Sequence, residues 1–225
     1  MKPIVLRFAR LLAGLFIMSV GITMAYQSGL GLSPWDVLND GASAILPITF
    51  GQASILIGLV ILVIDMLLKE RVGFGTFINI VIVGMIVDLI VWMNLIPSYR
   101  GVEGLGQLLP RLALCVFSLI PCAYGMYLYM SARLGAGPRD GLMCAITRRS
   151  TKVPVGAIRI VLEGLALIGG WLLGGRVGLG TIILVLGNGP VMQLVFKLCK
   201  FEIKDLHNET IPETLAAIRS ASAAK

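Results

Sequence analysis

The chain has 225 residues, of which 57% are apolar and only 14% are charged, and its mean hydropathy is +0.91. A soluble globular domain carries about 25% charged residues, so this composition excludes a soluble domain and predicts an integral membrane protein. The net charge of +7 follows the membrane topology described next and does not predict a nucleic-acid partner.

Six apolar runs are long enough to cross the hydrocarbon core of a bilayer, which needs about 20 helical residues. Each run must be helical, because the bilayer holds no water to satisfy the backbone. The predicted fold class is therefore all-α, with one membrane domain over residues 1–200 and a short polar tail over residues 201–225. In chain order, the predicted spans are 11–26, 52–68, 76–93, 112–130, 157–173 and 181–196.

Positive charge is concentrated on one predicted side of the membrane. With the N-terminus inside, fifteen of the nineteen Lys and Arg residues fall in inner segments. Only Arg100, Arg111 and Arg176 fall in outer segments, and Arg159 lies within a span. Because cations gather in cytoplasmic loops, the sequence predicts a multi-pass protein of a bacterial inner (plasma) membrane, with both termini in the cytoplasm.

The second half of the chain repeats the first about 104 residues later. The stretch 30–36 (LGLSPWD) returns at 134–140 (LGAGPRD), and 71–76 (RVGFGT) returns at 176–181 (RVGLGT). Two copies of one unit are a common plan for transporters, whose pathway lies between the copies. Further matched pairs are Arg7 with Arg111, Gly51 with Gly156, and Gly84 with Gly189.

Each copy contains a Gly/Pro loop and a short predicted helix, at about 34–46 and 138–147. At ~1.5 Å per residue such a helix covers about half of the bilayer core, so it is re-entrant or interfacial and not a full crossing. Three crossings per copy would place the second copy upside down. Charge favours this inversion, because 28–49 has no Lys or Arg whereas its counterpart 133–153 has five. The predicted repeats, each of three spans and one half-helix, cover about 7–93 and 111–197.

The two Gly/Pro loops form the first candidate site. Ser33 and Asp36 have the spacing of a capping box, and Asp140 takes the place of Asp36 in the second copy. Either the aspartates only cap short helices, or two half-helix N-termini meet a polar or anionic solute near the symmetry centre. Trp35 and Arg139 occupy matched positions. They are either a ring and an anion-selecting charge at a constriction, or an interface anchor and a positive-inside residue.

Polar residues inside the predicted spans form the second candidate site, because a charge there costs ~2.5–3.5 kcal/mol unless it is paired. Arg159 and Glu163 are four residues apart and can pair on one helix face, as a structural pair or as part of the pathway. Asp88 lies deep in the third span and is a candidate proton or cation site, or a partner for Arg159. Asn188 lies in the sequence GNGP, which predicts a broken last helix with free carbonyls.

The repeated RVGxGT motif predicts a structural turn. Its glycines permit a tight reversal and close helix packing, and Thr76 and Thr181 can cap the helices that follow. No His, Cys and Asp spacing suits a metal, and no nucleophile with a base or nucleotide fingerprint is present in the sequence. The sequence therefore predicts no enzymatic activity, no cofactor and no metal.

The loops resemble those of the YczE/YyaS/YitT family of bacterial integral membrane proteins. The resemblance is carried by 29–38 (GLGLSPWDVL), 51–58 (GQASILIG) and 71–76 (RVGFGT), and it covers about residues 7–197. It implies a multi-pass membrane protein and implies no particular activity.

Two function classes follow from these patterns. The first is a small-solute transporter or channel with a pathway between the inverted repeats. The second is a non-transporting membrane scaffold or regulatory protein, in which the repeat is only architectural and the two half-helices are packed apart. The expected partners are the lipid bilayer, an unknown small solute and, in one arrangement, further copies of the chain. Nucleic acid is not expected.

Overall fold

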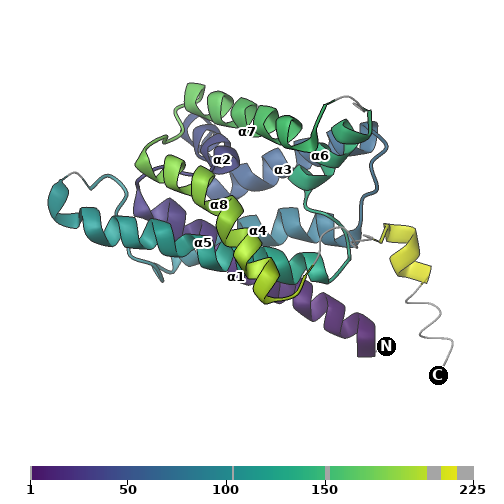
Figure 1. The fold of residues 1–225 in the computed structure, drawn as a ribbon. Helices are drawn as coiled ribbons and strands as arrows, with labels where there is room; N and C mark the ends of the chain where they lie inside the picture. Colours follow the sequence, from purple (N-terminus) through teal and green to yellow (C-terminus); the bar gives the residue numbers. More distant parts are fainter. Residues whose placement is uncertain (1, 103, 150–152, 202–208, 217–225) are drawn as a thin grey trace.

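The computed structural model describes residues 2–102, 104–149, 153–201 and 209–216 (Figure 1). Within these ranges every long regular element is an α-helix. The order of helix lengths is the same in both halves: a long helix, a 12-residue helix and two helices of 18 to 20 residues. The elements are α1 (Lys2–Ser28), α2 (Pro34–Ile45), α3 (Phe50–Leu67), α4 (Phe74–Trp92), the 3-10 turn η1 (Leu105–Gln107), α5 (Leu108–Ser131), α6 (Pro138–Arg149), α7 (Val155–Leu172) and α8 (Leu179–Leu198).

Six of the described helices are long and apolar enough to cross a membrane, and they are the six predicted spans: α1, α3, α4, α5, α7 and α8. The all-α prediction is confirmed. The first helix of each half is longer than predicted, because Arg7 and Arg111 lie inside α1 and α5. The side chain of each arginine binds the end of the other helix. Arg7 donates from Nε to the Ala132 carbonyl (2.8 Å), and Arg111 from Nε to the Ser28 carbonyl (3.0 Å).

The helices α1 and α5 pack closely along one another at the centre of the bundle. Their contact is made by glycine, because a Cβ added at Gly125 would lie 2.6 Å from the carbonyl oxygen of Gly14, and one at Gly14 would lie 2.8 Å from that of Gly125. Small residues let membrane helices approach closely where hydrophobic burial gives no driving force. The α1–α5 pair is thus the shared axis of the two halves.

Each Gly/Pro loop binds the RVGxGT turn of the opposite half. The Gly180 N–H donates to the Leu30 carbonyl (2.8 Å), and the Gly75 N–H donates to the Leu134 carbonyl (2.7 Å). Gly31, at φ +113°, and Gly135, at φ +136°, bring the loop backbone against the threonine of that turn. An added Cβ would lie 2.6 Å from the Thr181 hydroxyl oxygen at Gly31 and 2.8 Å from the Thr76 hydroxyl oxygen at Gly135. The two repeated motifs therefore hold each other across the halves.

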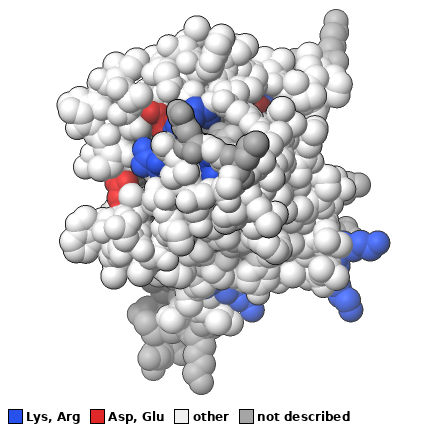
Figure 2. Space-filling model, turned by 90° about the vertical axis from the view of Figure 1, so that its left-hand side faces the viewer, with Lys and Arg blue, Asp and Glu red and all other residues white. Residues whose placement is uncertain are grey.

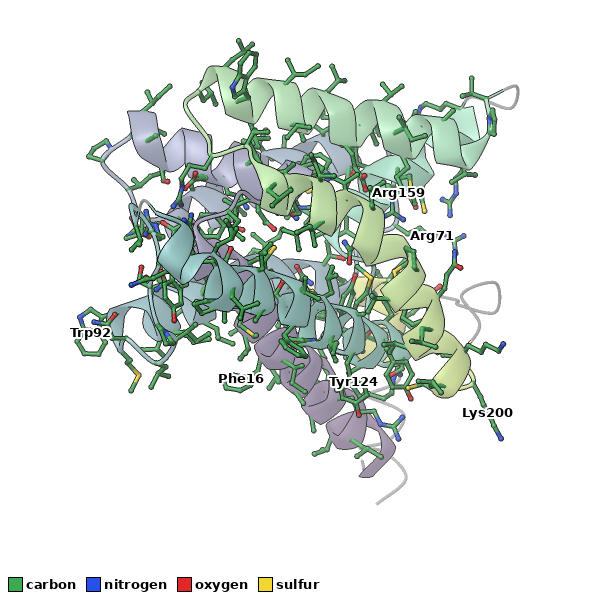
Figure 3. The ribbon with its side chains drawn as sticks, turned by 60° about the vertical axis from the view of Figure 1, so that its left-hand side comes forward. Phe16, Arg71, Trp92, Tyr124, Arg159 and Lys200 are labelled. Atoms are coloured by element: carbon green, nitrogen blue, oxygen red, sulfur yellow. The ribbon has the colours of Figure 1, made fainter. Side chains whose placement is uncertain are left out.

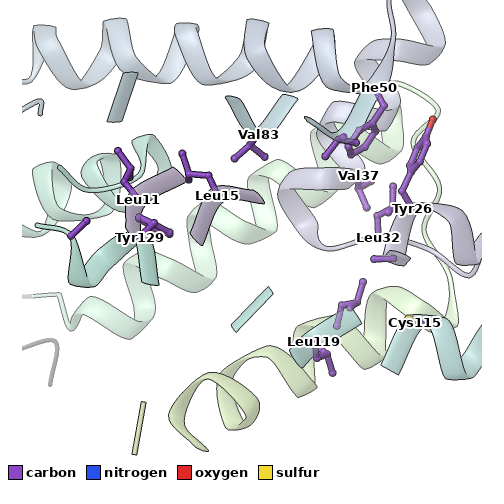
Figure 4. Packing of buried hydrophobic residues seen from close by; sticks show 14 of the residues in the cluster. Leu11, Leu15, Tyr26, Leu32, Val37, Phe50, Val83, Cys115, Leu119 and Tyr129 are labelled. Atoms are coloured by element: carbon purple, nitrogen blue, oxygen red, sulfur yellow. The ribbon is translucent and has the colours of Figure 1, made fainter. Parts of the chain in front are cut away.

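Two further helix contacts run between the halves: α2 lies against α7, and α6 against α3. Within each half, α4 packs on α1 and α8 on α5, and the short helices α2 and α6 contact α3 and α7. The last helix pair of each half differs between the copies. Helix α3 packs along α4, whereas α7 and α8, over their described lengths, do not pack closely against each other. Buried apolar side chains fill the centre of the bundle (Figure 4), where Leu11 and Leu15 of α1 lie near Val83 of α4 and Tyr129 of α5.

The outer surface of the bundle is apolar, as a bilayer requires. In the face drawn in Figure 2, charged side chains are few, and most of the surface is uncharged. Phe16 and Tyr124 point outward from α1 and α5 in Figure 3, while Trp92 and Lys200 lie at opposite ends of the molecule. The described part of the tail binds near the start of α1, where Glu209 pairs with Arg7 (2.7 Å).

Candidate functional site

The N-terminal ends of α2 and α6 meet near the middle of the bundle. Each helix begins with a proline, Pro34 and Pro138, whose fixed φ suits the first helical turn. Arg139, in the first turn of α6, places Nη2 3.5 Å from Oδ1 of Asp36, in the first turn of α2. Its guanidinium carbon also lies 5.4 Å from the ring centroid of Trp35. Matched positions of the two halves are thus in direct contact.

A cavity of about 190 Å³ lies between these helix ends and is bounded by both halves of the chain. Its apolar walls come mainly from α1, α4, α5 and α8, and polar side chains are placed among them. This is the usual make-up of a small-molecule site. The polar lining residues include Ser33, Trp35, Ser54, Asn79, Tyr129, Arg139, Asp140, Arg159, Glu163 and Asn188.

Arg159 and Glu163 form an ion pair on α7, with Nε 2.8 Å from Oε1. Arg159 side-chain exposure is 45% and Glu163 side-chain exposure is 29%, although both lie within a membrane-spanning helix. Figure 3 shows Arg159 on the side of α7 that faces α8. The pair therefore borders the space between two helices that do not pack together.

Asp140 is bound by a tyrosine of the central helix pair. The Tyr129 hydroxyl donates to Oδ2 of Asp140 over 3.0 Å. Burial raises the pKa of the Asp140 carboxyl, and this effect is opposed by the Tyr129 hydrogen bond and by the nearby charges of Arg159 and Arg139. Asp140 thus holds its proton more tightly than an exposed aspartate does.

Ser33 is placed at the N-cap of α2 as predicted, but its side chain makes no capping hydrogen bond. Its hydroxyl instead donates to Oδ2 of Asp36 over 2.5 Å. The predicted capping box is therefore wrong in this respect. The physical reason is the direction of the side chain: the rotamer that brings the Ser33 hydroxyl to the charged Asp36 carboxylate leaves its oxygen without a bond from a backbone N–H of the first turn. This contact also helps to aim Asp36 at Arg139.

Asp88 lies outside the cavity, and it is not the partner of Arg159. It binds the first turn of α3, where it accepts hydrogen bonds from the Thr49 hydroxyl and from the Gly51 N–H (2.8 Å). Free N–H groups at a helix N-terminus attract a carboxylate, so Asp88 joins α4 to α3 in the structure. Its counterpart Gln193 makes no such contact with α7.

Asn188 lines the cavity, but the prediction of a broken last helix is wrong. Helix α8 continues from Leu179 to Leu198 through Pro190. Pro190 removes one N–H from the helix, and membrane helices tolerate this loss when neighbouring groups adjust. Asn188 therefore faces the cavity from a continuous helix.

Tyr129, Ser54 and Asn79 also line the cavity, although they are not among the predicted site residues. A signal for two of them was present in the repeat, because Tyr129 is matched by Ala25, and Asn79 is matched by Leu184. A polar side chain that only one copy carries is not demanded by the shared architecture. Among the described residues, no group of three or more His, Cys, Asp or Glu side chains is placed to hold a metal ion.

Comparisons with known proteins agree with the membrane fold. A family model described as "Family of unknown function (DUF6198)" matches residues 5–197. The chain is 32% identical to an "Uncharacterized protein" of Haemophilus influenzae, over 84% of this chain and 82% of that protein. It is 32% identical to the "Uncharacterized membrane protein YczE" of Bacillus subtilis, over 85% of this chain and 86% of the relative.

A third relative is the Bacillus subtilis "Uncharacterized protein YyaS", which is 28% identical over 80% of this chain and 88% of its own length. No solved structure matches the chain at a significant level. The resemblance to YczE and YyaS noted in the loop motifs is confirmed by these matches. With its family match extending over nearly the whole membrane domain, the chain belongs to the DUF6198 family of membrane proteins.

Proposed function

We propose that this protein transports a small solute across a bacterial inner membrane, through the cavity between two inverted repeats. The observation that carries the proposal is a difference between equivalent helix pairs around one shared cavity: α3 packs along α4, and α7 does not pack closely along α8. The protein acts without covalent chemistry, and both of its termini face the cytoplasm.

The inverted arrangement is supported by contacts that come in matched pairs. Exchanging the halves turns the Arg7–Ala132 contact into Arg111–Ser28, and the α2–α7 contact into α6–α3. In inverted-repeat transporters the substrate site lies near the bilayer midplane, where helix N-termini of the two copies meet. The ends of α2 and α6 fit that description, because Asp36 and Arg139 are in contact.

Two matched glycine pairs show the difference in helix packing between the halves. Gly51 and Gly84 are in direct contact, so that a Cβ on either would overlap the carbonyl oxygen of the other. Their counterparts Gly156 and Gly189 have no heavy atom within 4 Å of an added Cβ. The same sequence feature is closed in one copy and open in the other.

This difference supports alternating access, in which one bundle moves against the other around a fixed site. If the two copies exchange conformations, α7 closes on α8 through Gly156 and Gly189, and α3 opens from α4. Access to the cavity then moves to the opposite side of the membrane. A scaffold needs no such exchange and predicts half-helices packed apart, which the 3.5 Å approach of Arg139 to Asp36 does not favour.

Cross-linking tests this motion directly. In a variant whose four native cysteines are replaced by alanine, Gly156→Cys and Gly189→Cys together should form a disulfide in membranes under mild oxidation. A matched pair, Gly164→Cys with Gly189→Cys, serves as control, because an added Cβ at Gly164 also meets no heavy atom within 4 Å. Cross-linking of neither pair, or of both at equal rates, would contradict alternating access.

A further inference from the structure

We propose that the cavity takes the zwitterionic head of an amphipathic molecule, which reaches it sideways from the bilayer between α7 and α8. The apolar chain of this molecule would lie in a hollow beside Val185. The inference rests on the proposed transport function and deepens it by naming the class of substrate.

Charges of both signs meet at the cavity. Arg139 is paired with Asp36 and Arg159 with Glu163, and the remaining carboxyl, Asp140, is buried against the Tyr129 hydroxyl. A site with paired charges of both signs suits a solute of single charge less well than one that carries both signs. It offers both signs to a molecule that carries both, and complementary charge of this kind decides which ligand is admitted.

Trp35 adds a second place for the cationic part of such a head. Its ring lines the cavity, and its face is occupied by the Arg139 guanidinium at 5.4 Å. Aromatic faces bind ammonium groups as well as guanidinium groups. An ammonium group could therefore replace Arg139 at the ring, leaving the arginine to bind the anionic part of the same head.

A second hollow, of about 430 Å³, adjoins the cavity and is almost wholly apolar. It lies between α7 and the first turns of α8, and Val185 lines both spaces. Ile182 and Leu186 border the hollow and are 58% and 69% exposed, as side chains facing lipid are. An apolar chain can therefore reach the polar cavity from the bilayer without crossing a polar surface.

The Arg159–Glu163 pair favours a polar group in the space between α7 and α8. A charge in the hydrocarbon region costs energy unless it is paired or hydrated, and 45% of the Arg159 side chain is exposed beside this space. A zwitterionic head placed there would satisfy both charges at once. Hydrocarbon alone would satisfy neither.

A lipid-transfer assay tests the inference. The full chain is reconstituted in phosphatidylglycerol vesicles that contain traces of phosphatidylethanolamine with an NBD fluorophore on an acyl chain, and transfer between leaflets is followed by dithionite quenching. We expect the protein to accelerate transfer of this zwitterionic lipid. Val185→Trp, which fills the junction of the two spaces, should slow the transfer about tenfold, a barrier change of about 1.4 kcal/mol.

Val116→Trp is the matched control, because Val116 on α5 is similarly exposed (47% against 43% for Val185) and lines neither space. It should transfer lipid at the native rate. If Val185→Trp fails to insert, Ile182→Trp fills the same hollow. If NBD-labelled phosphatidylglycerol is transferred equally fast, the protein does not select a zwitterionic head. If Val185→Trp and Val116→Trp have equal effects, the lipid does not enter between α7 and α8.

A second experiment distinguishes a lipid from a water-soluble molecule with the same head group. If vesicles take up radiolabelled glycerophosphoethanolamine, and Val185→Trp leaves this uptake unchanged while no lipid is transferred, the apolar chain has no role and the inference fails. That result would not contradict the proposed transport function. The transport function is tested separately, and the absence of the Gly156–Gly189 cross-link would contradict it.

Discussion

At the scale of residues, the positions where the two copies differ are the ones that meet in the cavity. Trp35 and Arg139 are a matched pair in the sequence and a cation–π pair in the structure. Arg159 and Glu163 replace the Ser54 and Gly58 of the first copy, and they border the space between α7 and α8. Comparison of the two copies thus distinguishes residues that both copies share, which belong to the architecture, from residues that occur in one copy only.

Removal of one member of the Arg159–Glu163 pair should abolish transport without preventing membrane insertion. Arg159→Ala leaves Glu163 uncompensated in a spanning helix, at a cost of ~2.5–3.5 kcal/mol. The measurement is uptake into proteoliposomes of whichever metabolite most raises the melting temperature of the native protein. Exchange of the two residues in one chain keeps the pair, so it should restore part of the uptake. Native uptake by Arg159→Ala would contradict a role in the pathway.

Asp140 should make stability depend on pH. Burial raises its pKa in the folded protein, so the folded state binds the proton more tightly than the unfolded state. The contribution of Asp140 to stability is therefore greatest at low pH and falls as pH rises from the unfolded pKa, about 3.9, through the raised folded pKa.

Thermal unfolding of the purified protein across this pH range measures the effect. Asp140→Asn has the same hydrogen-bonding shape without the titration, so its melting temperature should lose this slope. The other charged or titratable groups that face the site, Arg139, Arg159, Glu163 and Tyr129, are unchanged in that variant and serve as its internal reference. Parallel pH curves for the two proteins would show that Asp140 titrates normally.

At the scale of elements, the sequence predicted the short helices and the spans well. The predicted segments 34–46 and 138–147 correspond to Pro34–Ile45 and Pro138–Arg149. Prolines and glycines fix such boundaries locally. Contacts between distant elements were not predictable in the same way. That Asp88 binds the start of α3, for example, depends on how α4 crosses it, and no local pattern encodes that crossing.

The glycine contact between α1 and α5 should be sensitive to a single methyl group. Gly125→Ala places a Cβ 2.6 Å from the Gly14 carbonyl oxygen, and forcing apart well-packed helices costs about 1–3 kcal/mol. Unfolding in detergent, followed by circular dichroism, measures the loss. Gly164→Ala on α7 meets no atom within 4 Å and should leave stability unchanged or slightly raised, because alanine favours helix over glycine.

At the scale of the whole molecule, the proposed inverted arrangement makes a prediction about sidedness. Gly101, in the loop before α5, and Arg71, between α3 and α4, should lie on opposite sides of the membrane. In the cysteine-free background, Gly101→Cys should react in intact cells with a maleimide that cannot cross the inner membrane. Arg71→Cys should react only after permeabilisation. Equal labelling of both positions in intact cells would contradict the inverted topology.

Charge and hydropathy sufficed for the class of protein and its spans because the bilayer acts on each segment separately. The cavity could be predicted only in part. Repeat matching brought Trp35 and Arg139 to attention, whereas the spacing of α7 and α8 depends on packing between distant helices, which no local pattern encodes. The open surroundings of Gly156 and Gly189 are therefore seen only in the structure.

The mutual binding of loops and turns has a consequence for the origin of the chain. A single half would leave the Leu30 carbonyl without its Gly180 partner and the Ser28 carbonyl without Arg111. Two identical halves inserted in opposite directions would satisfy every one of these groups. If the halves are inverted as proposed, these contacts are the ones that two copies of a small three-span protein would make as an antiparallel pair. Gene fusion and a redistribution of arginine would then fix each half in one direction.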